Sequence, residues 1–266
     1  MSDEKDLIYN RLFLKNGSQR HISVFISGAD NIGTSWCALT IAHAFNLEKK
    51  KVLLVDGNGD FSNIASYLSL QAPQYLEQYI SGHKTLNQLI SAYKNKDFNI
   101  LTGKSGNGYL DEQPLGRIHL FADDLNIISE NYEQTLIDAG TNISEKTLSL
   151  CQIADNIIMM CSENNADLIK TFDLIKFMNE INIPANYYLI INKVNSFEDG
   201  YKIYEKLNKA ADRNNLRFPD LLGIVRMDTR IRDTIKNKEL LLSRYPTSEA
   251  ALDICGIAKK LGKENF

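Results

Sequence analysis

The chain has 266 residues, 44% of them apolar and 24% charged, with a formal net charge of −3. These values are typical of a globular protein and disfavour a basic protein whose main partner is nucleic acid. No apolar stretch approaches the roughly 18 residues that span a bilayer, and the acidic start MSDEKD is unlike a secretory signal peptide. Four scattered cysteines without a CxxC pair indicate buried free thiols. We therefore expect a cytoplasmic protein.

Short apolar runs alternate with amphipathic segments. In chain order we expect strand Ile22–Ile26, helix Thr34–Leu47, strand Val52–Val55, helices Phe61–Leu70, Tyr75–Ile80 and Thr85–Tyr93, strand Phe98–Leu101, helix Leu115–Ser129, strand Thr135–Asp138, helix Glu145–Ile153, strand Ile157–Cys161, helix Asp167–Glu180, strand Tyr187–Ile191, helix Phe197–Arg213, strand Leu221–Val225, and helices Thr229–Asn237 and Ser248–Leu261. All-apolar strands separated by helices predict a doubly wound α/β fold, with a mostly parallel sheet of about seven strands and helices on both faces. No linker or repeat divides residues 21–266, so we expect one domain after a polar N-terminal segment, residues 1–20.

The stretch between the first strand and the first helix has the spacing of a phosphate-binding loop. Gly28 and Gly33 frame it and Ser35 follows, as in GxxxxGK[ST]. Such a loop binds an anion through backbone N–H groups and the dipole of the next helix. Thr34 stands where the pattern has lysine. A charge-assisted hydrogen bond contributes about 1.5–3 kcal/mol, so its loss weakens triphosphate binding roughly 10- to 100-fold.

An alternative interpretation is a plain strand-to-helix turn that uses glycine for positive φ. The polar residues at other strand ends bear on this choice. Asp56 and Asp138 each end an apolar strand, where magnesium–phosphate sites place carboxylates, and Ser35 could add a hydroxyl ligand. Helix capping is the alternative role for either aspartate alone. Asn192 follows another strand and could read a purine edge with its amide, or form a turn. The nucleotide-binding candidates are Gly28, Asn31, Gly33, Thr34, Ser35 and Asn192, and the magnesium candidates are Ser35, Asp56 and Asp138.

Several segments, in the same order, resemble the MinD/ParA ATPases. VLLVDGNGDFSN (Val52–Asn63) is similar to the family's VLLVDADPDLGN, and LIDAGTNIS (Leu136–Ser144) to IIDTGAGIS. INKV (Ile191–Val194) lies where the family has its base-reading asparagine. Asp228–Ala251 is similar to a C-terminal DxxVR…YPxSxAA pattern, and Leu68–Ile90 resembles the flagellar site-determining, FlhG-like branch.

The resemblance implies a P-loop NTPase fold and an ATP-dependent switch. In the family, ATP joins two protomers through a deviant loop, KGGxGK[ST], whose first lysine reaches the partner's phosphates. Family members set where, and how many, division sites, plasmids or flagella are made. This chain has a degenerate Walker A loop by comparison. The replacements are Ala29 and Thr34 for the two lysines, Asp30 and Asn31 for two glycines, Asn58 for the switch aspartate that positions water, and Asn142 for a switch glycine.

These replacements predict a pseudo-ATPase of the FlhG-like branch. It would have no catalytic residue and would regulate flagellar number or placement through protein partners, flagellar-assembly factors being the candidates. No cofactor would be required, and ATP or ADP with Mg²⁺ would bind only if the loop still holds an anion. Assembly would be monomeric, or dimeric without being driven by ATP.

Two other functions remain open. The first is an active ATPase switch that uses a substitute cation, such as Lys104 in a glycine-rich loop. The second is a DNA-partition protein, which the net charge disfavours. The last helix has core-like spacing and only five residues after it, so we expect no stable membrane insertion. An apolar stripe at Leu7, Ile8, Leu12 and Leu14 is either a docking helix or a frayed terminus.

Overall fold

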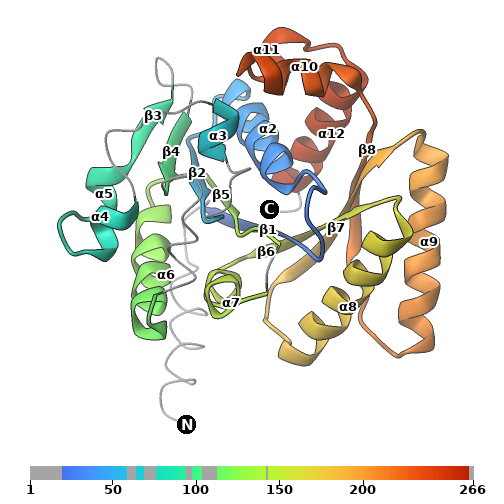
Figure 1. Ribbon diagram of the computed structural model, residues 1–266, viewed down its shortest axis with the longest axis horizontal. Helices are drawn as coiled ribbons and strands as arrows, with labels where there is room; N and C mark the ends of the chain where they lie inside the picture. The colour runs from blue at the N-terminus through green and yellow to red at the C-terminus, as the bar shows by residue number, and fades with distance from the viewer. Residues whose placement is uncertain are drawn as a thin grey trace.

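The computed structural model describes residues 20–58, 64–68, 76–93, 98–103, 113–141 and 143–263. Their strands form an eight-stranded sheet with helices packed against both of its faces (Figure 1). This arrangement confirms the predicted doubly wound α/β fold, with one strand more than the seven expected. Among the described helices, none is long and apolar enough to cross a membrane.

The strands follow the order β3-β4-β2-β5-β1-β6-β7-β8 across the sheet. They are β1 (His21–Ser27), β2 (Val52–Asp56), β3 (Ser91–Tyr93), β4 (Phe98–Thr102), β5 (Gln134–Asp138), β6 (Asn156–Ser162), β7 (Asn186–Val194) and β8 (Asp220–Arg226). Every neighbouring pair is parallel except β3 with β4, which is antiparallel. Because parallel strands need crossover connections, helices lie between them along the chain.

The described helices largely match the prediction. They are α2 (Thr34–Leu47), α3 (Ile64–Leu68), α4 (Leu76–Ile80), α5 (Leu86–Leu89), α6 (Leu115–Ser129), α7 (Glu145–Gln152), α8 (Asn165–Ile181), α9 (Phe197–Arg213), α10 (Thr229–Asn237), α11 (Leu241–Arg244) and α12 (Glu249–Lys263). The expected bounds of α2, α6, α9 and α10 are confirmed to the residue. Helix α11 was not expected, and residues 61–63, 69–70 and 75 of two expected helices lie outside the described residues.

The expected helix Thr85–Tyr93 is wrong beyond Leu89. Thr85 begins the short helix α5 through a capping box with Gln88. The chain then becomes extended and pairs with β4 as the edge strand β3. Leu86, Leu89 and Tyr93 have helical spacing, but Tyr93 packs on Phe98 across the β3–β4 pair, with ring centroids 5.3 Å apart. This tertiary contact overrides the local pattern.

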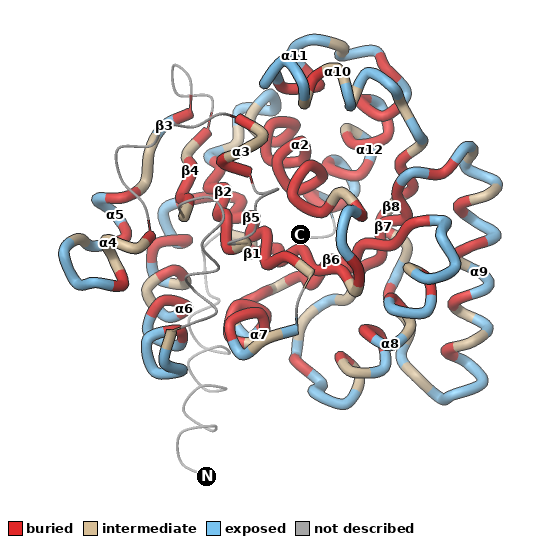
Figure 2. The backbone as a smooth tube through the Cα atoms, in the orientation of Figure 1, coloured by how far each residue is buried: buried red, intermediate tan, exposed pale blue. Residues whose placement is uncertain are grey.

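Two apolar cores lie on opposite faces of the sheet. Along β1, Ile22, Val24 and Ile26 belong to the core beneath α6–α9, whereas Phe25 belongs to the core beneath α2, α11 and α12. Both faces of the central strands are therefore buried, as Figure 2 shows. The cysteines are free thiols, three buried and Cys255 half-buried.

The carboxyl ends of β2, β5 and β1 are neighbours because these strands are adjacent in the sheet. The loops that follow them therefore gather at one edge, where ligands bind in open α/β sheets. This is the edge predicted to carry the site.

Candidate functional site

The loop from Gly28 to Ser35 connects β1 to α2, and its two glycines answer different steric demands. Gly33 has a φ of +98°, and a Cβ atom there would lie 2.7 Å from the Asn192 side-chain nitrogen. Gly28 is not in the left-handed region, but a Cβ atom there would lie 2.5 Å from the backbone oxygen of Lys170 in α8. The interpretation that glycine serves only a positive φ therefore applies to Gly33 and not to Gly28, where the close approach of α8 excludes a side chain.

Thr34, at the position of the missing lysine, turns toward β1. Its hydroxyl donates to Ser27 Oγ at 3.1 Å, and Ser27 Oγ donates to the Ala29 carbonyl at 3.0 Å. Thr34 and Ser35 are each 6% exposed. The loop therefore keeps the hydroxyls and the positive end of the α2 dipole, but not the cation that would face an outer phosphate.

Asp56 and Asp138 are the last residues of β2 and β5 and lie opposite each other in the parallel register. Both are buried. Asp56 Oδ2 accepts from the Ala65 N–H at 3.1 Å, and Asp138 Oδ1 accepts from the Gly140 N–H at 3.2 Å. Burial, and then the charge of Asp138, raise the pKa of Asp56 well above its ordinary value. The structure thus brings together the two carboxylates that the sequence singled out.

The chemistry of this pair suits a magnesium ion in part. Asp56 Oδ1 is buried without a hydrogen-bond partner in the described part of the chain, and Mg²⁺ prefers such oxygen ligands. However, the described residues contain no group of three or more histidine, cysteine or acidic side chains that could hold a metal. Asp56, Asp138 and Ser35 would therefore hold Mg²⁺ only with further oxygen ligands, which phosphates and waters supply in such sites.

A pocket of about 380 Å³ opens above the loop. Its lining residues are Asp30, Asn31, Ile32, Gly33, Thr34, Ser35, Asn58, Tyr67, Gly140 and Thr141. No lysine or arginine is among these described lining residues, and the one charged side chain is that of Asp30. Its Oδ1 accepts from Thr141 Oγ1 at 2.6 Å. The pocket therefore has the position of a phosphate site but an acidic lining.

Tyr67 in the pocket lining was missed by the sequence analysis. Burial, and then the charge of Asp138, raise the pKa of its phenol. Asn58 was singled out, and its side chain lies against Gly140, where a Cβ atom would be 3.0 Å from the Asn58 amide. No sequence signal distinguishes Tyr67, because a tyrosine on a short helix has the spacing of a core residue.

Asn192 lies near the end of β7 and holds the loop. Its Nδ2 donates to the Ile32 carbonyl at 2.7 Å, and its Oδ1 accepts from the Lys193 N–H at 2.8 Å. Lys193 has a φ of +60°, and its Nζ donates to the Asn31 carbonyl. Both amide atoms of Asn192 are thus engaged, and base reading by this residue stays a prediction. Lys193 was missed, because nothing in the sequence places it beside a loop 162 residues away.

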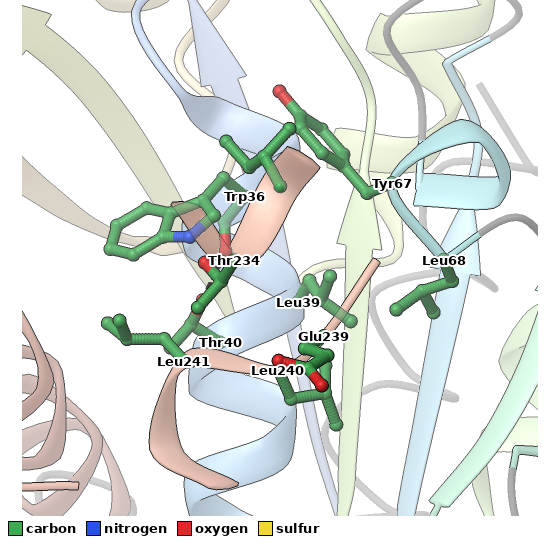
Figure 3. A pocket seen from close by; sticks show the side chains of 10 residues that line it. Trp36, Leu39, Thr40, Tyr67, Leu68, Thr234, Glu239, Leu240 and Leu241 are labelled. Atoms are coloured by element: carbon green, nitrogen blue, oxygen red, sulfur yellow. Dashed lines mark hydrogen bonds between the residues drawn. The ribbon is translucent and has the colours of Figure 1, made fainter. Parts of the chain in front are cut away.

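Trp36 follows Ser35 directly and packs away from the pocket. It is 5% exposed, on the side of α2 that faces Thr234 and Leu241 (Figure 3). The void between them has a volume of about 10 Å³, which is at the lower limit for one water molecule. This contact fixes the start of α2 against α10 and α11 and offers no ligand site.

Two residues of the predicted site region, Lys104 and Asn142, lie outside the described residues, as does the stretch 59–63. The arrangement above rests on the loop, the two aspartates and the β7 end.

Comparison with known proteins supports the fold and the wider class. No family profile matches the chain. The chain is 21% identical to Antiactivator FleN from Pseudomonas aeruginosa over 251 residues, which cover 92% of this chain and 88% of FleN. The septum site-determining protein MinD from Pyrococcus horikoshii, solved with Mg-ADP, superposes with a TM-score of 0.77 at 17% identity over 92% of this chain and 96% of that chain. A ParA family ATPase from Chlorobium tepidum gives 0.74 at 16% identity over 91% and 98%.

The architecture is therefore that of the MinD/ParA-type P-loop NTPases. The sequence is also similar to that of FleN over nearly the whole chain.

Proposed function

We propose that the protein is an FlhG-like regulator of flagellar number or placement that acts through protein partners without cycling on ATP. The observation that carries this proposal is the acidic lining of the phosphate pocket. Among its described lining residues, Asp30 has the one charged side chain. The similarity to FleN, which is named an antiactivator, supports the regulatory role.

Electrostatics argue against tight triphosphate binding. Each charge-assisted contact to phosphate contributes about 1.5–3 kcal/mol, and the two expected lysines are Ala29 and Thr34 here. Asp30 adds repulsion at the pocket wall. The backbone N–H groups and the α2 dipole remain, so a weakly held anion is compatible with the loop.

Among the described lining residues, the position expected to orient the attacking water carries an amide. Asn58 lines the pocket where the resemblance implies an aspartate, and an amide does not act as a general base at neutral pH. Both the binding step and the chemical step are therefore impaired in the same pocket.

A second candidate function is an ATP-binding switch with substituted residues. Lys193 favours it, because its ammonium group contacts the backbone of the loop at Asn31. In that case, Lys193 would move from the Asn31 carbonyl to a phosphate oxygen when nucleotide binds. The P. horikoshii MinD bound to Mg-ADP shows that this fold can hold a nucleotide in that protein.

Calorimetric titration with Mg-ATP and a phosphate-release assay separate the two functions. We expect no binding at micromolar ATP and no turnover by the wild-type protein. The variant Ala29→Lys/Asp30→Gly/Thr34→Lys restores the cations and should gain ATP affinity by at least about 100-fold. Micromolar binding and turnover by the wild type would instead establish the second function. The absorbance ratio of the purified protein gives an early check for retained nucleotide.

The regulatory role is tested in cells. Removal of the protein should change the number or position of flagella, and re-expression of an Asn58→Ala variant should restore the wild-type pattern. Failure of this variant, with its fold intact, would mean that the pocket chemistry is needed after all.

A further inference from the structure

Asp30 and Thr141 join two loops that leave neighbouring strands. Asp30 belongs to the loop after β1, and Thr141 to the loop after β5. The 2.6 Å contact between Thr141 Oγ1 and Asp30 Oδ1 has the short length of a charge-assisted hydrogen bond. It crosses 111 residues of sequence at the rim of the pocket.

The next two residues of the same loop are also tied across the chain. The Asn31 carbonyl accepts from Lys193 Nζ, and the Ile32 carbonyl accepts from Asn192 Nδ2. Asn31 itself is in the left-handed region, with a φ of +58°. Three consecutive residues are thus held from two sides, from the β5 loop and from the end of β7.

The loop after β5 is in turn held to β1 through its backbone. The Ser27 N–H donates to the Gly140 carbonyl at 3.3 Å, and the Gly140 N–H donates to Asp138 Oδ1 at 3.2 Å. The exposed Asp30–Thr141 hydrogen bond joins the same two loops on their solvent side. Because Asp30 is exposed, its removal leaves the apolar core intact.

We propose that Asp30 is a positioning residue that serves as a built-in anion, joining the phosphate loop to the β5 loop through Thr141 so that both hold one arrangement without a ligand. The Asp30 carboxylate lines the same pocket as Thr34 and Ser35 in the first turn of α2, whose dipole would attract a phosphate. The proposal deepens the proposed function, because a site that carries its own anion does not need nucleotide to order its loops.

A double-mutant cycle on the nucleotide-free protein tests the contact. Amide hydrogen exchange at Ser27 and Gly140 is measured by NMR in Asp30→Ala, Thr141→Val and the double variant. We expect each single variant to exchange about three- to tenfold faster at these amides, and the double variant no faster than the singles. Asp30→Asn keeps an acceptor oxygen and Thr141→Ser keeps the donor, so both should stay within about twofold of the wild type.

Asp173→Ala and Thr247→Val, at exposed positions elsewhere, are the matched controls. Unchanged exchange in both single variants, or rates that multiply in the double variant, would overturn the proposal. Near-ultraviolet circular dichroism is checked first, and a variant that loses it is replaced in the cycle by Asp30→Gly or Thr141→Ala, each of which also removes its side of the contact.

Inorganic pyrophosphate tests the anionic role separately. Asp30→Ala should bind it at least about tenfold more tightly than the wild type, because a like charge has been removed from the pocket wall. Thr141→Val should show no such gain, since the carboxylate remains. Equal affinity in Asp30→Ala and the wild type would refute the role of a built-in anion. Turnover of ATP by the wild type would defeat the proposed function and leave the exchange cycle, measured without nucleotide, to be judged on its own.

Discussion

The phosphate loop and the end of β8 lie at the same edge of the sheet, but their charged side chains are arranged in opposite ways. At β8, Arg226 donates through Nε and Nη2 to Asp253 at 3.1 and 2.9 Å, and through Nη1 to Glu249 at 2.6 Å. Its guanidinium also stacks 4.5 Å from the ring centroid of Phe197. Every formal charge there has a partner of opposite sign.

At the loop, like charges gather instead. Asp56 and Asp138 face each other across β2 and β5, and Asp30 stands at the pocket rim, while the described lining residues include no lysine or arginine. The comparison teaches that charges which hold this fold together are matched within the chain. Under the proposed function, the charges at the loop are what remains of a site whose counter-charges came from residues now replaced, or from a ligand.

The largest expected effect concerns the matched charges at the end of β8. Arg226→Met leaves the Asp253 carboxylate buried without its cation, so the free energy of unfolding should fall by about 2–4 kcal/mol, somewhat less than for a fully buried pair because Glu249 is exposed. Urea unfolding measures it. The control is Lys202→Met, whose ion pair with Glu198 is exposed and should leave the free energy of unfolding almost unchanged. Equal losses in the free energy of unfolding would contradict the expectation that the Arg226 ion pairs stabilise the fold more than the exposed Lys202 pair.

The next effect tests whether the loop is held by packing despite its lost charges. Gly28→Ala places a Cβ atom against the backbone of α8, and we expect a loss of about 1–3 kcal/mol in thermal or urea unfolding. Gly116→Ala is the matched control, because a Cβ atom there meets nothing within 4 Å and alanine favours a helix. If both variants were equally stable, α8 would not constrain the loop.

A smaller effect of opposite sign concerns the carboxylate pair. The pKa of Asp56 is raised in the folded state, so its contribution to stability is complete at acid pH and is lost as pH rises from about 4 through the folded pKa. Asp56→Asn removes this loss. We expect it to stabilise the protein near pH 7 by on the order of 1 kcal/mol, and not at pH 3.

Unfolding curves for Asp56→Asn at both pH values provide the measurement. A destabilised variant at pH 7 would mean that the ionised carboxylate is matched by a cation after all. Repeating the experiment with Mg²⁺ shows whether that cation is the metal.

The smallest expected effect concerns Lys193. Lys193→Met removes one exposed hydrogen bond to the Asn31 carbonyl, and the free energy of unfolding should change by less than about 0.5 kcal/mol. The sharper readout is nucleotide affinity. If the variant lost ATP binding that the wild type possesses, Lys193 would be the substitute cation of the second candidate function.

Sequence patterns predicted the fold well where each signal is local. Helix α9 has one apolar face and a capped start at Ser196. Helix α2 is a continuously buried segment that follows Gly33, and β1 is a short apolar run, so all three are marked by local sequence. The edge strand β3 was missed because three residues carry little period. Its extended form depends on pairing with β4.

The site was predictable in its parts and not in its contacts. The two aspartates at strand ends had to converge once the sheet was parallel, and they do. The bonds from Asp30 to Thr141 and from Asn192 to Ile32 join residues more than 100 positions apart. No local pattern encodes such pairs, and they decide how the pocket is lined.

Trp36 gives the site an optical reporter. It is the one tryptophan in the chain, it is buried, and it follows Ser35 directly in the first turn of α2. Its intrinsic fluorescence therefore arises from a single position beside the phosphate loop, without any label. Shifts in its emission or in its quenching by iodide would follow loop rearrangement in real time, with pyrophosphate, ATP or a protein partner in the same cuvette.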